Sequence, residues 1–188
     1  MKSIINYILE QKFSRLMNHK YEDEVKSVIW DYVAGYITNV NDELRKGKNP
    51  KEVTELLDKG FTKKTKINLY RTVSWDYLKN IYGLTRENIK EHIGDVITNK
   101  GYMSASSEYR SPWGDKWTKD EVIIHLTSDS QYPCIDVNEI FSESEIDCYF
   151  QKEIILPRDT KLRIDSVSMK NDKSFYKDGN YYIEMNII

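Results

Sequence analysis

Several residue types that identify common classes of protein are scarce in this chain of 188 residues. It has only two cysteines, Cys134 and Cys148, and their spacing matches neither a metal-binding nor a redox motif. We predict that both are free thiols, with a disulfide between them as the alternative. The three histidines, His19, His92 and His125, are scattered, which favours surface or core positions over metal ligation. We therefore expect no bound metal.

An excess of charge of either sign is also missing. The net charge of −2 and the isoelectric point near 6.0 give no electrostatic argument for binding nucleic acid. No apolar run is long enough to span a membrane. The first ten residues are interrupted by Asn6 and Glu10, and they are too short and polar for a secretion signal. If the protein is secreted, its signal has been removed or its export route is unusual.

The motifs of several common enzymes are absent as well. The chain has no glycine-rich dinucleotide fingerprint and no phosphate-binding loop. It also lacks the Gly-x-Ser-x-Gly elbow of serine hydrolases. What it does contain is aromatic residues, including fourteen tyrosines and four tryptophans, which fill cores and also line nucleotide sites. The length and the 39% of hydrophobic residues are typical of one soluble domain.

The first third of the chain has helical periodicity. Apolar residues recur at spacings of three and four from Val25 to Leu44, which predicts one long amphipathic helix ending near Gly47. The segment from Asn49 to Glu52 has the pattern of a helix start and predicts a second helix, to about Asp58. Two further helices are expected to begin at Ser74 and Thr85.

From Ile67 onward the pattern changes to short apolar runs separated by turn residues, as expected for strands. These runs are Ile67–Tyr70, Tyr102–Ser104, Val122–Leu126, Cys134–Val137, Phe150–Leu156, Leu162–Val167 and Tyr181–Ile188. Helices followed by strands predict the α+β class, not alternating β and α units. We expect a single domain over residues 1–188, with a helical region (1–60) packed on a mixed two-sheet β core (65–188).

The start of the run Phe150–Leu156 carries two polar residues, Gln151 and Glu153. Residues two apart in a strand point to the same face, about 7 Å from each other. An amide and a carboxylate would thus be presented together at a reactive edge. The acidic residues before them, Glu143, Glu145 and Asp147, suggest a two-carboxylate glycosidase as a distant alternative, but a solvated loop is favoured.

Three further positions could bind a ligand. Arg71 ends a predicted strand, where it could form a surface ion pair or clamp an anion. Asn41 and Arg45 are four apart on the predicted long helix, so they could meet one ligand or form a solvated face. Ser104 and Ser106 share a strand face and could orient a carboxylate or a ribose, or they could simply lead into a turn.

A polar loop contains two tryptophans, Trp113 and Trp117, with Lys116 between them. The rings could pack on the core as a lid, or they could stack on a flat ligand. The composition favours neither alternative.

Taken in order, these segments resemble the mono-ADP-ribosyltransferase family of bacterial toxins. That family has an arginine on a first strand, a Ser-Thr-Ser strand and a Glu/Gln-x-Glu motif, which appear here as Leu69-Tyr70-Arg71, Ser104-Ala105-Ser106 and Gln151-Lys152-Glu153. Gln151 in place of the first glutamate, the single-domain size and the helices ahead of the strands are similar to the C3-like exoenzymes, which modify Rho GTPases. Ala105 departs from the family's threonine, and the overall acidity departs from the mostly basic C3 enzymes.

The resemblance implies cleavage of the nicotinamide–ribose bond of NAD and transfer of ADP-ribose to a protein, without a metal. Glu153 would stabilise the developing positive charge on the ribose, with Ser104 holding it in place. Gln151 would recognise an acceptor amide, which favours asparagine over arginine, and an aromatic, Tyr149 or Phe150, precedes it.

The resemblance also implies how NAD would be held. Arg71, Arg45 and Lys116 would bind the diphosphate, Asn41 would assist from the helix, and Trp113 would pack against nicotinamide.

The implied partner is a host protein, a Rho-family GTPase, and the implied setting is a secreted, monomeric bacterial toxin, a virulence factor acting in the host cytosol. Two alternatives remain open. The protein could be an NAD glycohydrolase that uses water as the acceptor, or a binding module without catalytic activity.

Overall fold

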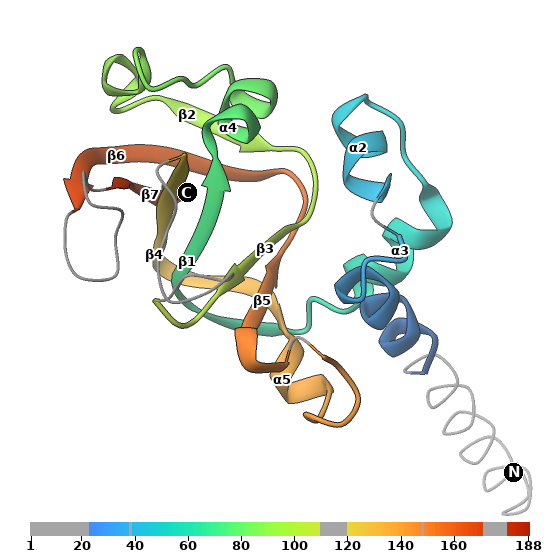
Figure 1. Ribbon diagram of the computed structural model, residues 1–188. Coiled ribbons are helices and arrows are strands. Elements are labelled where there is room, and N and C mark those ends of the chain that lie inside the picture. Colours follow the sequence, from blue (N-terminus) through green and yellow to red (C-terminus); the bar gives the residue numbers. More distant parts are fainter. Residues whose placement is uncertain (1–22, 38, 110–119, 148, 171–179) are drawn as a thin grey trace, which may run out of the picture.

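The computed structural model describes residues 23–37, 39–109, 120–147, 149–170 and 180–188. Its helical region comprises residues 23–33, α2 (Asn39–Arg45) and α3 (Lys51–Lys59). This region lies to one side of the strands (Figure 1). The predicted order of helices followed by strands is therefore confirmed.

The prediction of one long helix from Val25 to Leu44 is wrong. The chain is helical over 23–33, turns over 34–37 and becomes helical again at Asn39. Gly35 has a φ of 82°, a left-handed conformation that ends an α-helix and that glycine adopts without a steric penalty. Because the apolar spacing continues across this turn, periodicity alone did not reveal the break.

The other predicted helices have mixed outcomes. The second helix is confirmed as α3, and the helix at Ser74 is confirmed as α4 (Trp75–Tyr82). The side chain of Ser74 caps α4 by accepting a hydrogen bond from the Tyr77 amide at 3.1 Å. The helix at Thr85 is wrong, because only the short 3-10 helix η1 (Ile89–His92) forms there. Asn88 Oδ1 accepts a hydrogen bond from the Thr85 amide at 2.6 Å, a local turn that competes with a helix.

Seven strands and two more short helices, α5 (Val137–Ile140) and the 3-10 helix η2 (Tyr149–Gln151), make up the rest of the described elements. The strand β2 was not predicted, and β4 joins two predicted strands into one. The strands are β1 (Lys63–Ser74), β2 (Val96–Asn99), β3 (Met103–Ser106), β4 (Glu121–Asp136), β5 (Glu153–Leu156), β6 (Thr160–Lys170) and β7 (Asn180–Ile187).

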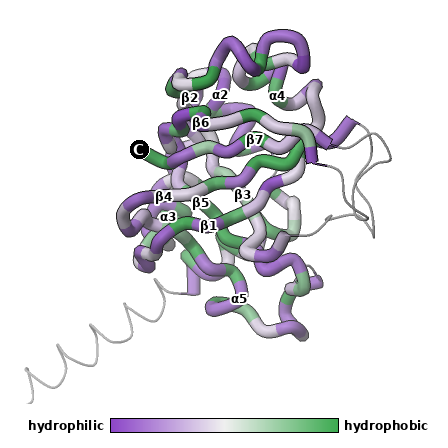
Figure 2. The backbone as a smooth tube through the Cα atoms, turned by 90° about the vertical axis from the view of Figure 1, so that its left-hand side faces the viewer, coloured by the Kyte–Doolittle hydropathy of each residue, from purple (hydrophilic) through white to green (hydrophobic). Residues whose placement is uncertain are grey.

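The strands are hydrogen-bonded into a single sheet in the order β1-β3-β5-β4-β7-β6-β2, with an additional pairing of β1 with β4. The α+β class is thus confirmed, whereas the two-sheet core is only an approximation. The β1–β4 pairing closes β1, β3, β5 and β4 into a ring, and β4 also pairs in parallel with β7. Hydrophobic residues run along the strands in the middle of the molecule (Figure 2).

Two hydrophobic clusters account for most of the core. The larger lies within the sheet and includes Leu78 of α4, while the second joins the helical region to β4 and β5. Ile29, Leu57, Ile135 and Ile155 belong to this second cluster and are at most 1% exposed. Cys134, a free thiol, is buried in the larger cluster, and Cys148 lies outside the described residues.

Polar contacts around Tyr102 reinforce this junction. The Asn41 side chain accepts a hydrogen bond from the Tyr102 amide at 2.7 Å and donates one to the Tyr102 carbonyl at 3.1 Å. We call this pair of bonds the Asn41 brace. The Tyr102 hydroxyl donates to Asp58 at 2.7 Å, and Arg158 is paired with the same carboxylate at 2.7 Å. The helical region is thus bonded to the residue just before β3, Tyr102, and to a residue just after β5, Arg158.

The Asn41 brace requires glycine at position 101. A Cβ atom there would lie 2.5 Å from Asn41 Oδ1, so the amide would have to move and give up its bonds to Tyr102. We expect Gly101→Ala to lower the free energy of unfolding by about 1–3 kcal/mol, the cost of leaving buried polar groups unpaired. Denaturant titration measures this loss.

The control for this prediction is the same substitution in an Asn41→Ala background. There the obstructing amide is gone, so the cost of Gly101→Ala should largely vanish. Equal costs in the two backgrounds would show that the brace is not what glycine protects.

Candidate functional site

The pairing of β3 with β5 brings Ser104 and Glu153 together. Ser106 lies directly opposite Glu153 and Ser104 is opposite Ile155, so Ser104 is the diagonal neighbour of Glu153 on the same face. The Ser104 hydroxyl forms a hydrogen bond with the Glu153 carboxylate. Burial raises the pKa of Glu153, and this effect exceeds the opposing effects of the Ser104 hydrogen bond and of the Arg71 charge.

Arg71 comes from β1, next to this pair. Its guanidinium donates a hydrogen bond to the Ser104 carbonyl and lies over the Tyr77 ring, with Cζ 5.3 Å from the ring centroid. Arg45 of α2 approaches the same ring at 5.7 Å and donates to the Tyr77 hydroxyl at 3.4 Å. One tyrosine thus gathers two guanidinium groups from separate elements.

These two arginines retain unused capacity to bind an anion. The Nε atoms of Arg45 and Arg71 are buried and have no hydrogen-bond partner among the described residues. Arg45 has one acidic partner, Asp42 at 3.2 Å. Buried donors are normally satisfied, so two unsatisfied ones beside each other point to a ligand with acceptor oxygens.

Asn41 lies at the same site, but its amide already has several partners. Besides the Asn41 brace, it donates a hydrogen bond to the Tyr32 hydroxyl at 3.0 Å. Tyr32 in turn forms a hydrogen bond with Ser104, and burial raises the pKa of Tyr32. Asn41 therefore links the helical region to the residue that holds Glu153.

Tyr32 and Tyr77 are site residues that the sequence analysis missed. Tyr32 was counted as one of the apolar positions of a helix, and Tyr77 was not singled out. The available signal was position, because Tyr77 follows Arg71 closely and Tyr32 precedes the pair Asn41 and Arg45. Apart from this position along the chain, nothing in the sequence distinguishes these tyrosines from those of the core.

The prediction that Gln151 and Glu153 share a strand face is wrong. Tyr149–Gln151 forms the 3-10 helix η2, Lys152 has a φ of 50°, and β5 begins only at Glu153. The end of β3 holds this turn, because the Ser106 hydroxyl donates to the Gln151 carbonyl at 2.6 Å. A side-chain bond thus holds the turn, while the Ser107 amide still donates a backbone hydrogen bond to the Lys152 carbonyl.

The aromatic residues before Gln151 differ in environment. Tyr149 packs partly against the helical cluster, with Lys152 Nζ 4.4 Å from its ring centroid, whereas Phe150 is 54% exposed. Trp113, Lys116 and Trp117 lie outside the described residues, so their predicted roles stay predictions.

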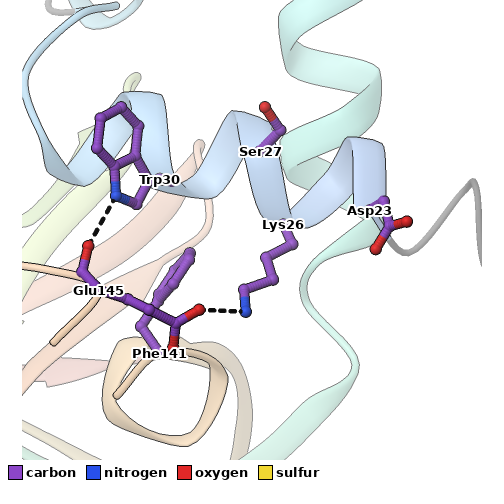
Figure 3. A pocket seen from close by; sticks show the side chains of 6 residues that line it. All are labelled: Asp23, Lys26, Ser27, Trp30, Phe141 and Glu145. Carbon is purple, nitrogen blue, oxygen red and sulfur yellow. Dashed lines mark hydrogen bonds and ion pairs between the residues drawn. The ribbon is translucent and has the colours of Figure 1, made fainter. Parts of the chain in front are cut away.

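Glu145, one of the carboxylates considered for a glycosidase pair, is bonded to other groups. It accepts a hydrogen bond from Lys26 (Figure 3). It also accepts hydrogen bonds from the amide and hydroxyl of Ser142. The Lys26 bond, together with those from Ser142, lowers the pKa of Glu145 to about 2. The sequence analysis favours a solvated acidic loop, and the structure adds these bonds, by which the side chain anchors the loop.

Two further properties concern only the described part of the chain. It contains no cluster of three or more histidine, cysteine, aspartate or glutamate residues that could hold a metal ion. None of its helices is both long and apolar enough to cross a membrane.

Comparison with known proteins matches residues 9–186 to the sequence model of the family described as ADP-ribosyltransferase exoenzyme. No curated protein matches the chain. Among solved structures, C3stau2 from S. aureus, determined with NAD, is similar with a TM-score of 0.68 and 18% identity, covering 100% of this chain and 97% of that one.

Two further structures have the same fold. Plx2a, an ADP-ribosyltransferase toxin from Paenibacillus larvae, has a TM-score of 0.65 and 20% identity, with 95% of this chain and 94% of that one covered. The Clostridium limosum C3 exoenzyme has a TM-score of 0.64 and 18% identity, with 94% of each chain covered. These identities are low, so the structures establish the fold, and the family match rests on the sequence.

The contact between Ser104 and Glu153 makes a prediction about ionisation. The hydrogen bond favours the charged carboxylate, so Ser104→Ala should raise the pKa of Glu153 further above that of an ordinary glutamate. The carboxyl resonance of Glu153, followed by ¹³C NMR across the acidic range and assigned by its loss in Glu153→Gln, measures this pKa. An unchanged or lower value would mean that the hydroxyl does not support the carboxylate.

Proposed function

The chain belongs to the ADP-ribosyltransferase exoenzyme family, and we propose that it transfers ADP-ribose from NAD to an asparagine of a Rho-type small GTPase. The main support for this proposal is the half-buried Glu153, which is hydrogen-bonded to Ser104 and lies in the electrostatic field of Arg71. A fixed carboxylate beside an anion-binding pair of arginines suits a dinucleotide that reacts at its ribose.

The reaction breaks the bond between the ribose and nicotinamide, which leaves with the bonding electron pair. The ribose becomes oxocarbenium-like, and the Glu153 carboxylate stabilises its positive charge. The acceptor nitrogen then attacks the same ribose carbon and loses a proton. Ser104 orients the carboxylate, and Tyr32, bonded to Ser104, supports that orientation from the helical region.

The residues that would hold NAD follow from the same contacts. Arg71 and Arg45 would bind the diphosphate, with Tyr77 keeping both guanidinium groups in place. Asn41 would contribute from α2, chiefly by positioning Tyr32. Trp113 would pack against nicotinamide, and Lys116 would also bind the diphosphate. The structure of C3stau2 with NAD, which shares this fold, supports NAD as the co-substrate.

Gln151, with Tyr149 and Phe150, would recognise the acceptor. A glutamine amide complements both the carbonyl and the NH₂ of an asparagine side chain, whereas a glutamate would suit a guanidinium. Similarity to C3-like exoenzymes supports a Rho-type target, export from a bacterium and action in the host cytosol. NAD hydrolysis would be a side activity, and hydrolysis without any protein acceptor is the second candidate.

Glu153→Gln tests the catalytic role, because it retains the shape of the side chain and removes its charge. We expect nicotinamide release to fall by at least about 100-fold, with little change in NAD affinity, since the charge acts mainly on the transition state. Single-turnover kinetics and NAD titration separate the two effects. Near-normal turnover would remove Glu153 from the catalytic role.

Gln151→Ala tests the division between transfer and cleavage. Incubation with labelled NAD and a purified Rho-type GTPase should show loss of protein labelling, while most nicotinamide release is retained. The turn at Lys152 separates Gln151 from Glu153, so its loss should leave the cleavage site intact.

Two outcomes would contradict this proposal. Equal loss of both activities in Gln151→Ala would place Gln151 in the NAD site. If the wild-type protein releases nicotinamide rapidly but labels no protein, neither the GTPase nor any in a host-cell lysate, the glycohydrolase alternative is correct.

A further inference from the structure

The loop that leads to Gln151 is attached to the helix of residues 23–33. Lys26 Nζ lies 2.8 Å from Glu145 Oε1, and Trp30 Nε1 donates a hydrogen bond to the Glu145 carbonyl at 3.0 Å (Figure 3). We call these two contacts the Glu145 latch. Lys26 and Trp30 are four residues apart and therefore project from the same face of the helix.

Glu145 also organises the loop itself. Its second carboxylate oxygen, Oε2, accepts hydrogen bonds from the Ser142 amide and hydroxyl, both at 2.8 Å. Phe141 and Ile146, on either side of this segment, are buried in the cluster that contains the helix. One residue therefore joins the internal structure of the loop to the helix.

Packing alone does not determine how the loop lies against the helix. Two hollows, of about 330 and about 390 Å³, flank the Glu145 latch, and both are lined by Trp30 and Glu145. A close-packed interface would hold the loop by contacts along its whole length. Here a few polar bonds act together with a small number of apolar side chains, Phe141, Ile146 and Tyr149.

The position of the loop is transmitted to Gln151 through a short path. The Tyr149 amide donates to the Ile146 carbonyl at 3.3 Å, and Asn138 donates to the Tyr149 carbonyl at 2.8 Å. The same helix carries Tyr32, which is bonded to Ser104 at the catalytic carboxylate. One helix thus contacts both the cleavage site and the loop before the acceptor-recognition turn.

We propose that the Glu145 latch holds the acceptor-recognition turn Tyr149–Gln151 in the position needed for transfer of ADP-ribose to a protein, and that it is dispensable for cleavage of NAD. Lys26, Trp30 and Glu145 are then positioning residues. This inference rests on the proposed function, because it presupposes a protein acceptor.

The energetics make the inference testable without unfolding the protein. The side chains of Lys26 and Glu145 are 42% and 43% exposed, and ion pairs with this exposure contribute little to global stability. Lys26→Met keeps most of the aliphatic stem and removes the charge. A loss of transfer alone in this variant would show that the acceptor-recognition turn is misplaced, because general destabilisation would reduce both activities.

The experiment measures nicotinamide release without acceptor and, separately, labelling of a purified Rho-type GTPase by labelled NAD. We expect Lys26→Met to lower kcat/KM for the GTPase by at least roughly tenfold, since small misplacements of reacting groups carry large rate penalties. Nicotinamide release and the melting temperature should stay near their wild-type values. Lys26→Arg should retain most of the transfer activity.

Two controls sharpen this test. Lys51→Met removes an ammonium from a longer and more exposed surface pair, with Glu55 at 3.7 Å on α3, and should leave both activities unchanged. Glu145→Gln should lower transfer at least as much as Lys26→Met, because it also weakens the bonds to Ser142, and the double variant should be little worse than Glu145→Gln alone.

The outcomes distinguish this inference from the proposed function. If Lys26→Met and Glu145→Gln transfer ADP-ribose at the wild-type rate, only the proposed role of the Glu145 latch is overturned. If both variants lose cleavage and transfer to the same extent, these residues support the fold in general, and the proposed role of the Glu145 latch is again overturned. Wild-type protein that labels no GTPase would overturn the proposed function and this inference together.

Discussion

The Asn41 brace is the contact on which the remaining site geometry depends. It binds both backbone groups of Tyr102, just before β3, and so determines where the helical region lies relative to Ser104. The same amide holds the Tyr32 hydroxyl, which reaches Ser104 and through it Glu153. The absence of a side chain at Gly101 permits this approach. A single amide thus couples helix packing to the orientation of the Glu153 carboxylate.

The site concentrates groups that oppose folding. Burial raises the pKa of Glu153, so its protonated form is more favoured in the folded state than in the unfolded state. Its contribution to stability is therefore present below the pKa of an ordinary glutamate and is lost as pH rises through the higher folded pKa. The unsatisfied Nε atoms of Arg45 and Arg71 carry a further desolvation cost. Unfavourable ionisation and unmet hydrogen bonds at one place are typical of a site shaped for a ligand.

Local rules predicted the elements whose ends have their own chemistry, such as α4, capped by Ser74 and ended by Gly83 at a φ of 71°. They failed where a local turn interrupts the pattern, as at Gly35 and Thr85, and where a distant contact decides the conformation. The β5 strand starts late because Ser106, from β3, binds the Gln151 carbonyl, and no neighbour in sequence reveals that bond. The order of motifs singled out Arg71, Ser104 and Glu153, which the fold brings together, whereas Tyr32 reaches Ser104 only through folding.

The late start of β5 changes how the two residues of the Gln-x-Glu motif are related. In a continuous strand, moving Gln151 would also move Glu153, because both would share one pleated backbone. Instead, the left-handed Lys152 separates them, and the Lys152 carbonyl accepts a hydrogen bond from the Ser107 amide at 3.1 Å. Gln151 therefore belongs to the loop and Glu153 to the sheet. Under the proposed function, changes in the loop would alter acceptor recognition while the sheet keeps the Glu153 carboxylate in place, so target choice and bond cleavage would vary independently.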